Sequence, residues 1–174
     1  NAVATSSMEP TENHIRLLFQ NTNDIVFCFQ GTQDGQRAAD QVLVNCLPYL
    51  SGDRNAHFLF IPYAEDLQSM VSADNGPMDF QQLIDSAKAA STWILERLKS
   101  GIDLESVEGR TKLIERTRNS INKLPDDMYR NELIVEVARM TGYAEETLYN
   151  IYGFESKHED NRATPEQVDG PDMS

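Results

Sequence analysis

Side-chain oxygens gather at one sharp turn of this sequence. The apolar run from Ile25 to Phe29 ends at Gln30-Gly31-Thr32, and a helical pattern begins directly after it. An apolar run, a glycine-containing turn and a helix in that order predict a strand–turn–helix unit of an α/β fold. Gln30 and Thr32 each offer a side-chain oxygen but no charge. For Gly31 and Gly35 we expect a conformational role, because glycine permits tight turns and close helix–strand approach.

Cysteine and histidine residues offer no further catalytic or metal-binding set. Cys28 and Cys46 fall in an apolar strand and on an apolar helix face, so we predict two buried free thiols rather than a disulfide or a metal site. The three histidines, His14, His57 and His158, form no ligand-spaced pair, which leaves a zinc site without support.

Acidic residues dominate the charge of the 174-residue chain, whose net charge is −13. No segment holds a basic cluster, and phosphate contacts depend mostly on lysine and arginine. We therefore expect no strong nucleic-acid binding by this chain alone. No apolar run has membrane-spanning length, and residues 1–7 lack the basic and apolar regions of a secretion signal. These features favour a cytoplasmic protein with no membrane partner.

The spacing of apolar residues predicts an α/β region in the first part of the chain. It indicates a helix over 11–20 capped by Thr11, a strand over 25–29, a helix over 34–46 and a second strand over 57–61. The uninterrupted apolar run of the first strand is typical of a central parallel strand covered on both faces. A right-handed crossover helix is the usual connection between two parallel strands.

After Pro62 the pattern becomes helical. Residues 65–72 predict a short helix, every segment from Met78 onward is predicted to be helical, and a last short helix is predicted over 145–152. We thus predict three parts: an α/β region over 1–76, a helical subdomain over 77–153 and an acidic tail over 154–174.

The predicted tail carries two basic and six acidic residues, a composition typical of disorder. A solubilising extension is the favoured interpretation, and a regulatory or partner-docking role is the alternative.

The strand–turn–helix resembles the second signature of the TOPRIM fold in bacterial DNA primases of the DnaG type, where the strand ends in Asp-Gly-Asp. The resemblance covers roughly residues 2–141 and implies a partial TOPRIM domain, with parallel strands and crossover helices, followed by an all-helical subdomain. The family role that it implies is RNA primer synthesis in DNA replication, a nucleotidyl transfer. The matching motifs follow one another in the family's order: Leu47-Pro48-Tyr49-Leu50, Phe58 to Pro62, Glu65-Asp66, Glu108-Gly109-Arg110 and Leu124-Pro125.

In that family a cluster of carboxylates binds Mg²⁺ for nucleotidyl transfer. By the resemblance, Gln30 and Thr32 stand at the Asp-Gly-Asp positions, and Gln68 stands at another acidic position. Glu65 and Asp66 remain as a weak, residual metal site. The alternative for this pair, which we favour, is an acidic first turn of a helix that interacts well with the helix dipole. We expect a degenerate site without a competent catalytic residue, and no cofactor beyond weakly bound Mg²⁺.

Several parts of the family have no counterpart in this sequence. We expect the upstream glutamate motif, the zinc-ribbon domain, the basic template-binding subdomain and the C-terminal helicase-binding domain to be missing. The first hypothesis is therefore a catalytically inactive primase-like protein of the primosome, which acts through contacts with a replication protein or with the rest of a primase.

Two alternatives stay open. The chain could be a fragment of a working primase core, with DNA-directed RNA polymerase activity once a missing N-terminal part is supplied. It could also derive from another TOPRIM enzyme, such as a nuclease or topoisomerase, although the helical match to primases argues against this. Whether the chain alone is an enzyme depends on which hypothesis holds.

Overall fold

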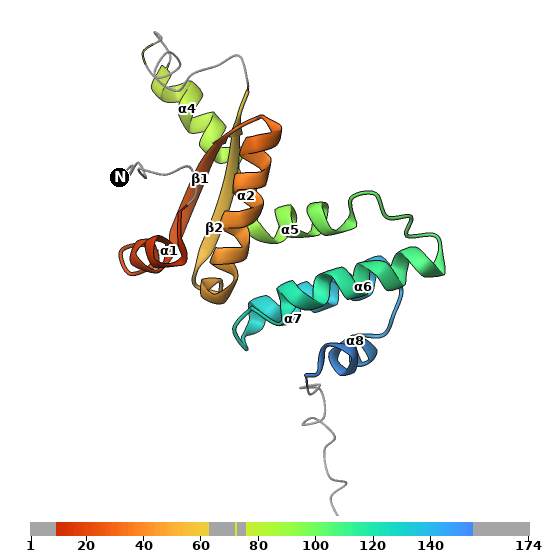
Figure 1. Ribbon diagram of the computed structural model, residues 1–174. Coiled ribbons are helices and arrows are strands. Elements are labelled where there is room, and N and C mark those ends of the chain that lie inside the picture. The colour runs from red at the N-terminus through yellow and green to blue at the C-terminus, as the bar shows by residue number, and fades with distance from the viewer. Residues whose placement is uncertain (1–9, 63–71, 73–75, 155–174) are drawn as a thin grey trace, which may run out of the picture.

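Strands and helices alternate in the first half of the protein (Figure 1). The structure is a computed structural model that describes residues 10–62, 72 and 76–154. Thr11 is the N-cap of the first helix, and the predicted strand–turn–helix is confirmed. Most of the helix predicted over 65–72 lies outside the described residues. The elements of this half are α1 (Glu12–Phe19), β1 (Asp24–Gln30), α2 (Gln33–Cys46), the 3-10 helix η1 (Leu47–Tyr49) and β2 (Asn55–Ile61).

The second half is mostly helical, with one exception. Lys88 and Ala89 form strand β3 (Lys88–Ala89), which pairs antiparallel with β2, so the prediction that every segment after Met78 is helical is wrong here. A two-residue strand is too short to leave an alternating pattern between two helical stripes. The α/β class with parallel strands and a helical continuation is confirmed. The helices are α4 (Gly76–Asp85), α5 (Ala90–Lys99), α6 (Val107–Ile121), α7 (Met128–Thr141) and α8 (Glu145–Tyr152).

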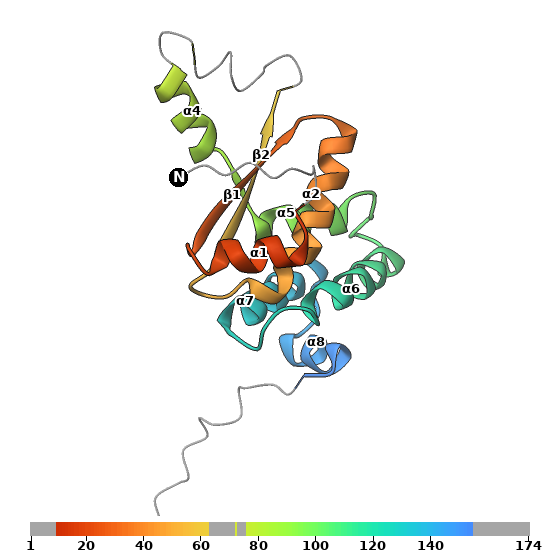
Figure 2. The ribbon, with the colours of Figure 1, turned by 60° about the vertical axis from the view of Figure 1, so that its left-hand side comes forward.

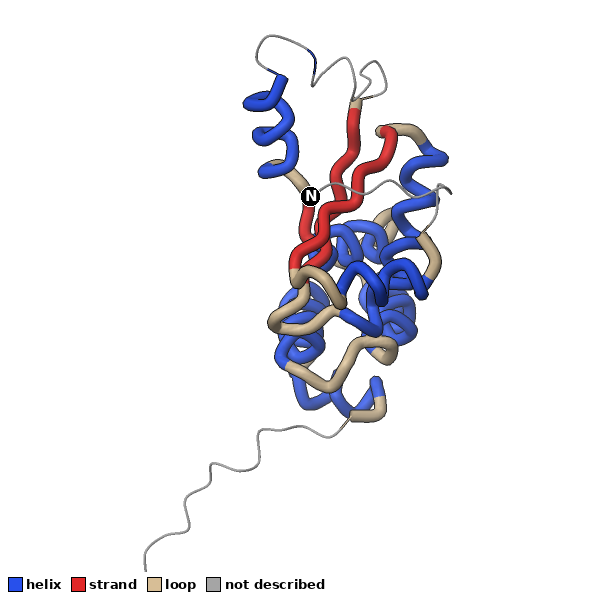
Figure 3. Tube along the Cα trace, turned by 90° about the vertical axis from the view of Figure 1, so that its left-hand side faces the viewer, coloured by secondary structure: helices blue, strands red, loops and turns tan. Residues whose placement is uncertain are grey.

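The sheet has the strand order β1-β2-β3, so β1 is an edge strand among the described residues. β1 and β2 are parallel, with Asp24 opposite Asn55 and Gln30 opposite Ile61. Successive β1 residues alternate between exposed and buried. Figure 3 shows most helices gathered on one side of the strands and beyond their lower end, while α4 stands apart. The prediction that β1 is covered on both faces is therefore wrong.

The alternation of β1 also exposes Cys28, so the two thiols lie in different environments. Cys28 is exposed and Cys46 is buried, and both are free, so the predicted burial of Cys28 is wrong. An unbroken apolar run shows that a strand is hydrophobic, but it does not show how many of its faces another element covers. Burial raises the pKa of the Cys46 thiol to about 12.

Phe58 of β2 lies in the middle of the first hydrophobic core. Its ring centroid is 5.8 Å from that of Phe27, 6.1 Å from that of Phe29 and 6.5 Å from that of Trp93. This core also takes in buried residues of α1, α2 and α5, among them Ala90. α5 thus packs on the sheet although it belongs to the region predicted as a helical subdomain, and the domain boundary at 76/77 stays a prediction.

A second core joins α6, α7 and α8 through Ile114, Ile134 and Leu148. Leu95 of α5 packs against both cores. Figure 2 shows α6, α7 and α8 gathered at the end of the molecule away from α4. Within the described ranges, no helix is both long enough and apolar enough to span a bilayer.

Candidate functional site

The first candidate site is the turn that joins β1 to α2. Gln30 ends β1 with an exposed side chain. The Gly31 amide donates a hydrogen bond of 2.7 Å to the Ile61 carbonyl, which extends the parallel pairing by one residue. A Cβ atom on Gly31 would lie 2.8 Å from the same carbonyl oxygen. The turn is therefore held closely against the end of β2, and only glycine fits there without displacing the backbone.

Thr32 is the N-cap of α2. Its hydroxyl accepts a hydrogen bond of 3.1 Å from the Gly35 amide, one of the donors that the start of a helix leaves without an intrahelical partner. A Cβ atom on Gly35 would lie only 2.0 Å from the Gln30 carbonyl oxygen. The contacts of Gly31 and Gly35 therefore support the conformational role expected for both glycines.

These residues do not fit tight Mg²⁺ binding. Gln30 and Thr32 contribute neutral oxygens, and the Thr32 oxygen already accepts the capping hydrogen bond. The nearest carboxylate in sequence, Asp34, pairs with Arg37 at 3.1 Å. Mg²⁺ selects charged oxygen ligands in near-ideal octahedral geometry. We therefore derive no metal-dependent step at this turn.

The carboxylates expected to complete the site are not described. Glu65, Asp66 and Gln68 lie outside the described residues, so the metal assignment to Glu65 and Asp66 stays a prediction. In the parts of the chain that the structure does describe, no three His, Cys, Asp or Glu side chains cluster in a way that could hold a metal ion.

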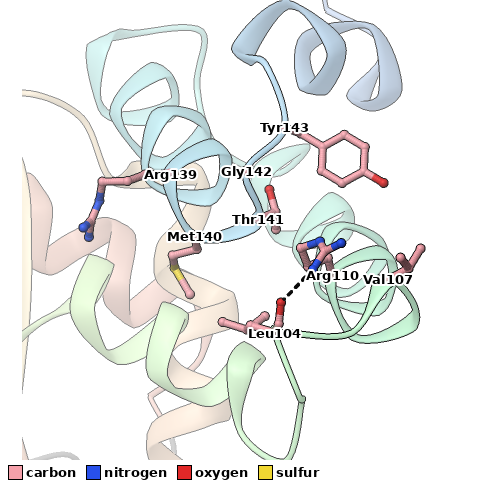
Figure 4. A pocket seen from close by; sticks show the side chains of 8 residues that line it. All are labelled: Leu104, Val107, Arg110, Arg139, Met140, Thr141, Gly142 and Tyr143. Atoms are coloured by element: carbon pink, nitrogen blue, oxygen red, sulfur yellow. Dashed lines mark hydrogen bonds between the residues drawn. The ribbon is translucent and has the colours of Figure 1, made fainter.

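A second candidate site is an open groove between the start of α6 and the end of α7 (Figure 4). Its volume is about 560 Å³. One wall comes from Leu104, Val107 and Arg110, and the other comes from residues 139–143. Sequence reasoning missed this groove, because its two walls come from segments that lie far apart in the sequence. The Glu108-Gly109-Arg110 motif was the only sequence signal near it.

A capped turn shapes the α6 wall. Ser106 is the N-cap of α6, and its hydroxyl accepts a hydrogen bond of 3.1 Å from the Gly109 amide. A Cβ atom on Gly109 would lie 1.7 Å from the Asp103 carbonyl oxygen. The Arg110 guanidinium donates to the carbonyls of Leu104 at 3.1 Å and Glu105 at 2.9 Å, which holds the preceding loop against the helix.

The rim of the groove is apolar and exposed. Val107 is 59% exposed and Tyr143 is 36% exposed. Arg139 donates hydrogen bonds to the Glu136 carboxylate, one of them at 2.9 Å. These hydrogen bonds lower the pKa of the Glu136 carboxyl. The groove therefore presents apolar surface beside the Arg110 guanidinium, whereas the Arg139 guanidinium pairs with Glu136 and points away from the other lining side chains (Figure 4). A partly apolar, negatively charged segment suits such a surface.

The chain is similar to bacterial DNA primases. A family model described as "DnaB-helicase binding domain of primase" matches residues 91–146. A DNA primase of Pasteurella multocida is 34% identical over 141 residues, which are 81% of this chain and 24% of that protein. A DNA primase domain from Pseudomonas aeruginosa has a TM-score of 0.75 and 29% identity, covering 82% of this chain and 44% of that one. A DnaG primase catalytic domain bound to ssDNA has a TM-score of 0.75 and 27% identity, covering 81% and 44%.

Two consequences follow from these matches. The chain spans about a quarter of the length of the curated relatives that it matches. The match at 91–146 takes in α5, α6, α7 and both walls of the groove. The expectation that this sequence has no counterpart of a helicase-binding domain is therefore wrong, because the matching pattern lies in the helices that follow the sheet.

Proposed function

This chain belongs to the bacterial DNA primase family, and from that premise we propose that it acts as a protein-contacting part of the priming machinery rather than as a polymerase by itself. The proposed partners are a replicative helicase and the remaining parts of a primase. The proposed place of action is the cytoplasm, where replication takes place in bacteria.

The observation that carries the proposal is the neutral β1–α2 turn. Gln30 is exposed but uncharged, and the Thr32 hydroxyl is engaged as the helix cap. A phosphoryl-transfer centre needs divalent ions to neutralise the charge that develops on the reacting phosphate. This turn has a strand–turn–helix backbone without charged ligands, which supports a scaffold role over a catalytic centre.

The match of residues 91–146 supports a protein partner. The net charge of −13 disfavours tight binding to nucleic acid, because phosphate binding relies on many lysine and arginine contacts. Both observations favour binding of another protein, rather than of nucleic acid, at the exposed helical surface.

Titration with Mg²⁺ by calorimetry tests whether the lack of charge at Gln30 and Thr32 weakens metal binding. We expect no binding tighter than millimolar for the unchanged chain, and markedly tighter binding for Gln30→Asp combined with Thr32→Asp. Aspartate is as good an N-cap as threonine, so the fold should tolerate the second change. Gln36→Asp, an exposed change one turn further along α2, is the matched control and should leave the affinity unchanged. Millimolar or tighter binding to the unchanged chain at Asp66 would contradict the proposal.

A binding measurement with the purified replicative helicase tests the partner. Analytical ultracentrifugation of the full chain with the helicase should give a co-sedimenting complex, and absence of a complex at micromolar concentrations would remove the helicase from the proposal. Residues of α5, α6 and α7 should then show reduced hydrogen exchange in the complex.

The second candidate function is a fragment of an active primase core. The similarity to a solved DnaG primase catalytic domain, at a TM-score of 0.75, favours it. Joining the chain to the N-terminal half of a related primase and measuring primer synthesis decides between the two functions. Primer formation by the joined protein supports the second function, and the absence of product under conditions where the intact relative is active excludes it.

A further inference from the structure

The groove between α6 and α7 has an unusual charge for this protein. Its lining includes Arg110 and Arg139 and no aspartate or glutamate, although Arg139 pairs with Glu136 beside the groove and the chain as a whole has a net charge of −13. The two arginines come from opposite walls (Figure 4). An acidic segment is thus the occupant that the charges of the lining favour.

The apolar lining narrows the choice of occupant. Val107 and Tyr143 are among the few large hydrophobic side chains that the described residues expose, and both lie at this groove. Met140, in the same lining, is unbranched and adapts readily to the shape of a bound side chain. A suitable occupant therefore combines one aliphatic side chain with flanking carboxylates.

We propose that the groove binds the C-terminal segment of the same chain, with Val168 against the apolar lining and the carboxylates of Glu166 and Asp169 facing Arg110 and Arg139. Val168 is the only valine, leucine or isoleucine after residue 154, and acidic residues stand on both sides of it. This inference does not depend on the proposed function.

The length of the chain permits this contact. Tyr143 lies at the groove, and α8, with eight residues, follows it. At about 1.5 Å per residue α8 is about 12 Å long, and the two residues that link it at each end add at most about 7 Å each, so Phe154 lies within about 26 Å of Tyr143. Fourteen positions separate Phe154 from Val168 (168 − 154), and a flexible chain of that length has a root-mean-square span of about 20 Å. A tether that matches the distance gives an effective concentration in the millimolar range.

The start of the segment is held in place. The Phe154 amide donates a hydrogen bond of 2.9 Å to the Tyr149 carbonyl, and the centroid of the Phe154 ring lies 4.0 Å from the Arg130 guanidinium carbon. Because Phe154 is held, the segment that follows it starts from a fixed point at the end of α8. The distance from this point to the groove is comparable to the electrostatic screening length in dilute salt, so the tail carboxylates and the groove arginines can attract one another.

Paramagnetic broadening in NMR tests the contact in the full chain. A nitroxide on Met173→Cys, in a Cys28→Ser background, should reduce the amide signals of Gly142 and Tyr143 at least twofold at low salt. The signal of Gly52, which is in the loop before β2, should not change. Arg139→Glu or Val168→Asp should abolish the broadening, and Arg139→Glu combined with Asp169→Arg should restore it.

A matched control separates this specific contact from general electrostatics. Arg37, like Arg139, is exposed and pairs with a carboxylate three residues earlier. Arg37→Glu should therefore leave the broadening at Gly142 unchanged.

Three results would overturn the proposal. The first is absence of broadening at low salt in the labelled chain that carries no further substitution. The second is broadening that survives both Arg139→Glu and Val168→Asp. The third is broadening that disappears when labelled chains are diluted with unlabelled chains, because that result would assign the groove to a second copy.

Discussion

Two helix starts in this protein share one local design and differ in their surroundings. At the start of α2, Thr32 accepts a hydrogen bond from Gly35, and at the start of α6, Ser106 accepts one from Gly109, both at 3.1 Å. In each case the glycine lies against a preceding carbonyl oxygen that a Cβ atom would meet at 2.0 Å or less. A hydroxyl cap followed three residues later by glycine thus forms the same tight turn twice.

The difference lies in what each turn presents. The α2 turn follows a parallel strand and exposes the uncharged Gln30. The α6 turn follows a loop and places Val107 and Arg110 in the wall of a groove. The cap motif therefore determines the backbone conformation of the turn. The neighbouring side chains determine whether the turn only supports the fold or also forms part of a binding surface.

The largest expected effect tests the shared geometry. Gly35→Ala and Gly109→Ala should each reduce the free energy of unfolding by about 3 kcal/mol or more, because the added methyl group collides with backbone rather than with a movable side chain. Urea unfolding measures the change. Gly52→Ala is the control, since nothing lies within 4 Å of its added Cβ atom. Similar stability for all three variants would show that the two turns are not closely packed.

Alkaline pH should reduce stability in part through the buried thiol at the end of α2. α2 ends in Cys46, and burial raises the pKa of its thiol from the ordinary value of 9.0 to about 12. The unfolded chain loses this proton first as pH rises, so stability present below pH 9 falls between pH 9 and about 12. We expect a loss of about 2 kcal/mol between pH 9 and 10.5 from this group, measured by urea unfolding. Cys46→Ala should be less stable at pH 8 but should lack this share of the alkaline loss.

The caps themselves should contribute less. Thr32→Ala should cost about 1 kcal/mol of unfolding free energy. Ser106→Ala should cost somewhat more, because the Ser106 hydroxyl also donates a hydrogen bond of 2.9 Å to the Asp103 carbonyl. Thr32→Asp should be close to neutral, since aspartate keeps an acceptor for the Gly35 amide. Equal costs for the two alanine variants would show that the second hydrogen bond adds nothing.

The smallest effects are expected at the ion pairs near each site. Arg37→Ala and Arg139→Ala remove pairs with Asp34 and Glu136, and both arginines are more than 70% exposed. Exposed pairs of this spacing contribute about 0.3–0.5 kcal/mol. Thermal unfolding should therefore detect little change in either variant, and a larger loss at Arg139 alone would indicate an additional contact at the groove.

The order of secondary structure could be predicted from the sequence, because it depends on local patterns. Thr11 marks the start of α1, and the step from apolar run to polar turn marks the end of β1. The neutral character of Gln30 and Thr32 was also evident from residue types alone. β3 escaped prediction because its two residues, Lys88 and Ala89, gain their strand conformation only by pairing with β2.

The sequence by itself determined the helices, the two parallel strands, the glycine-dependent turns and the absence of charge at Gln30 and Thr32, since each follows from residue type and spacing along the chain. The tertiary structure decided that Cys28 is exposed while Cys46 is buried, and that Val107 and Tyr143 meet at one groove. Burial and contact depend on which elements pack together. A pattern along one strand or helix shows which face is apolar, but not what covers that face.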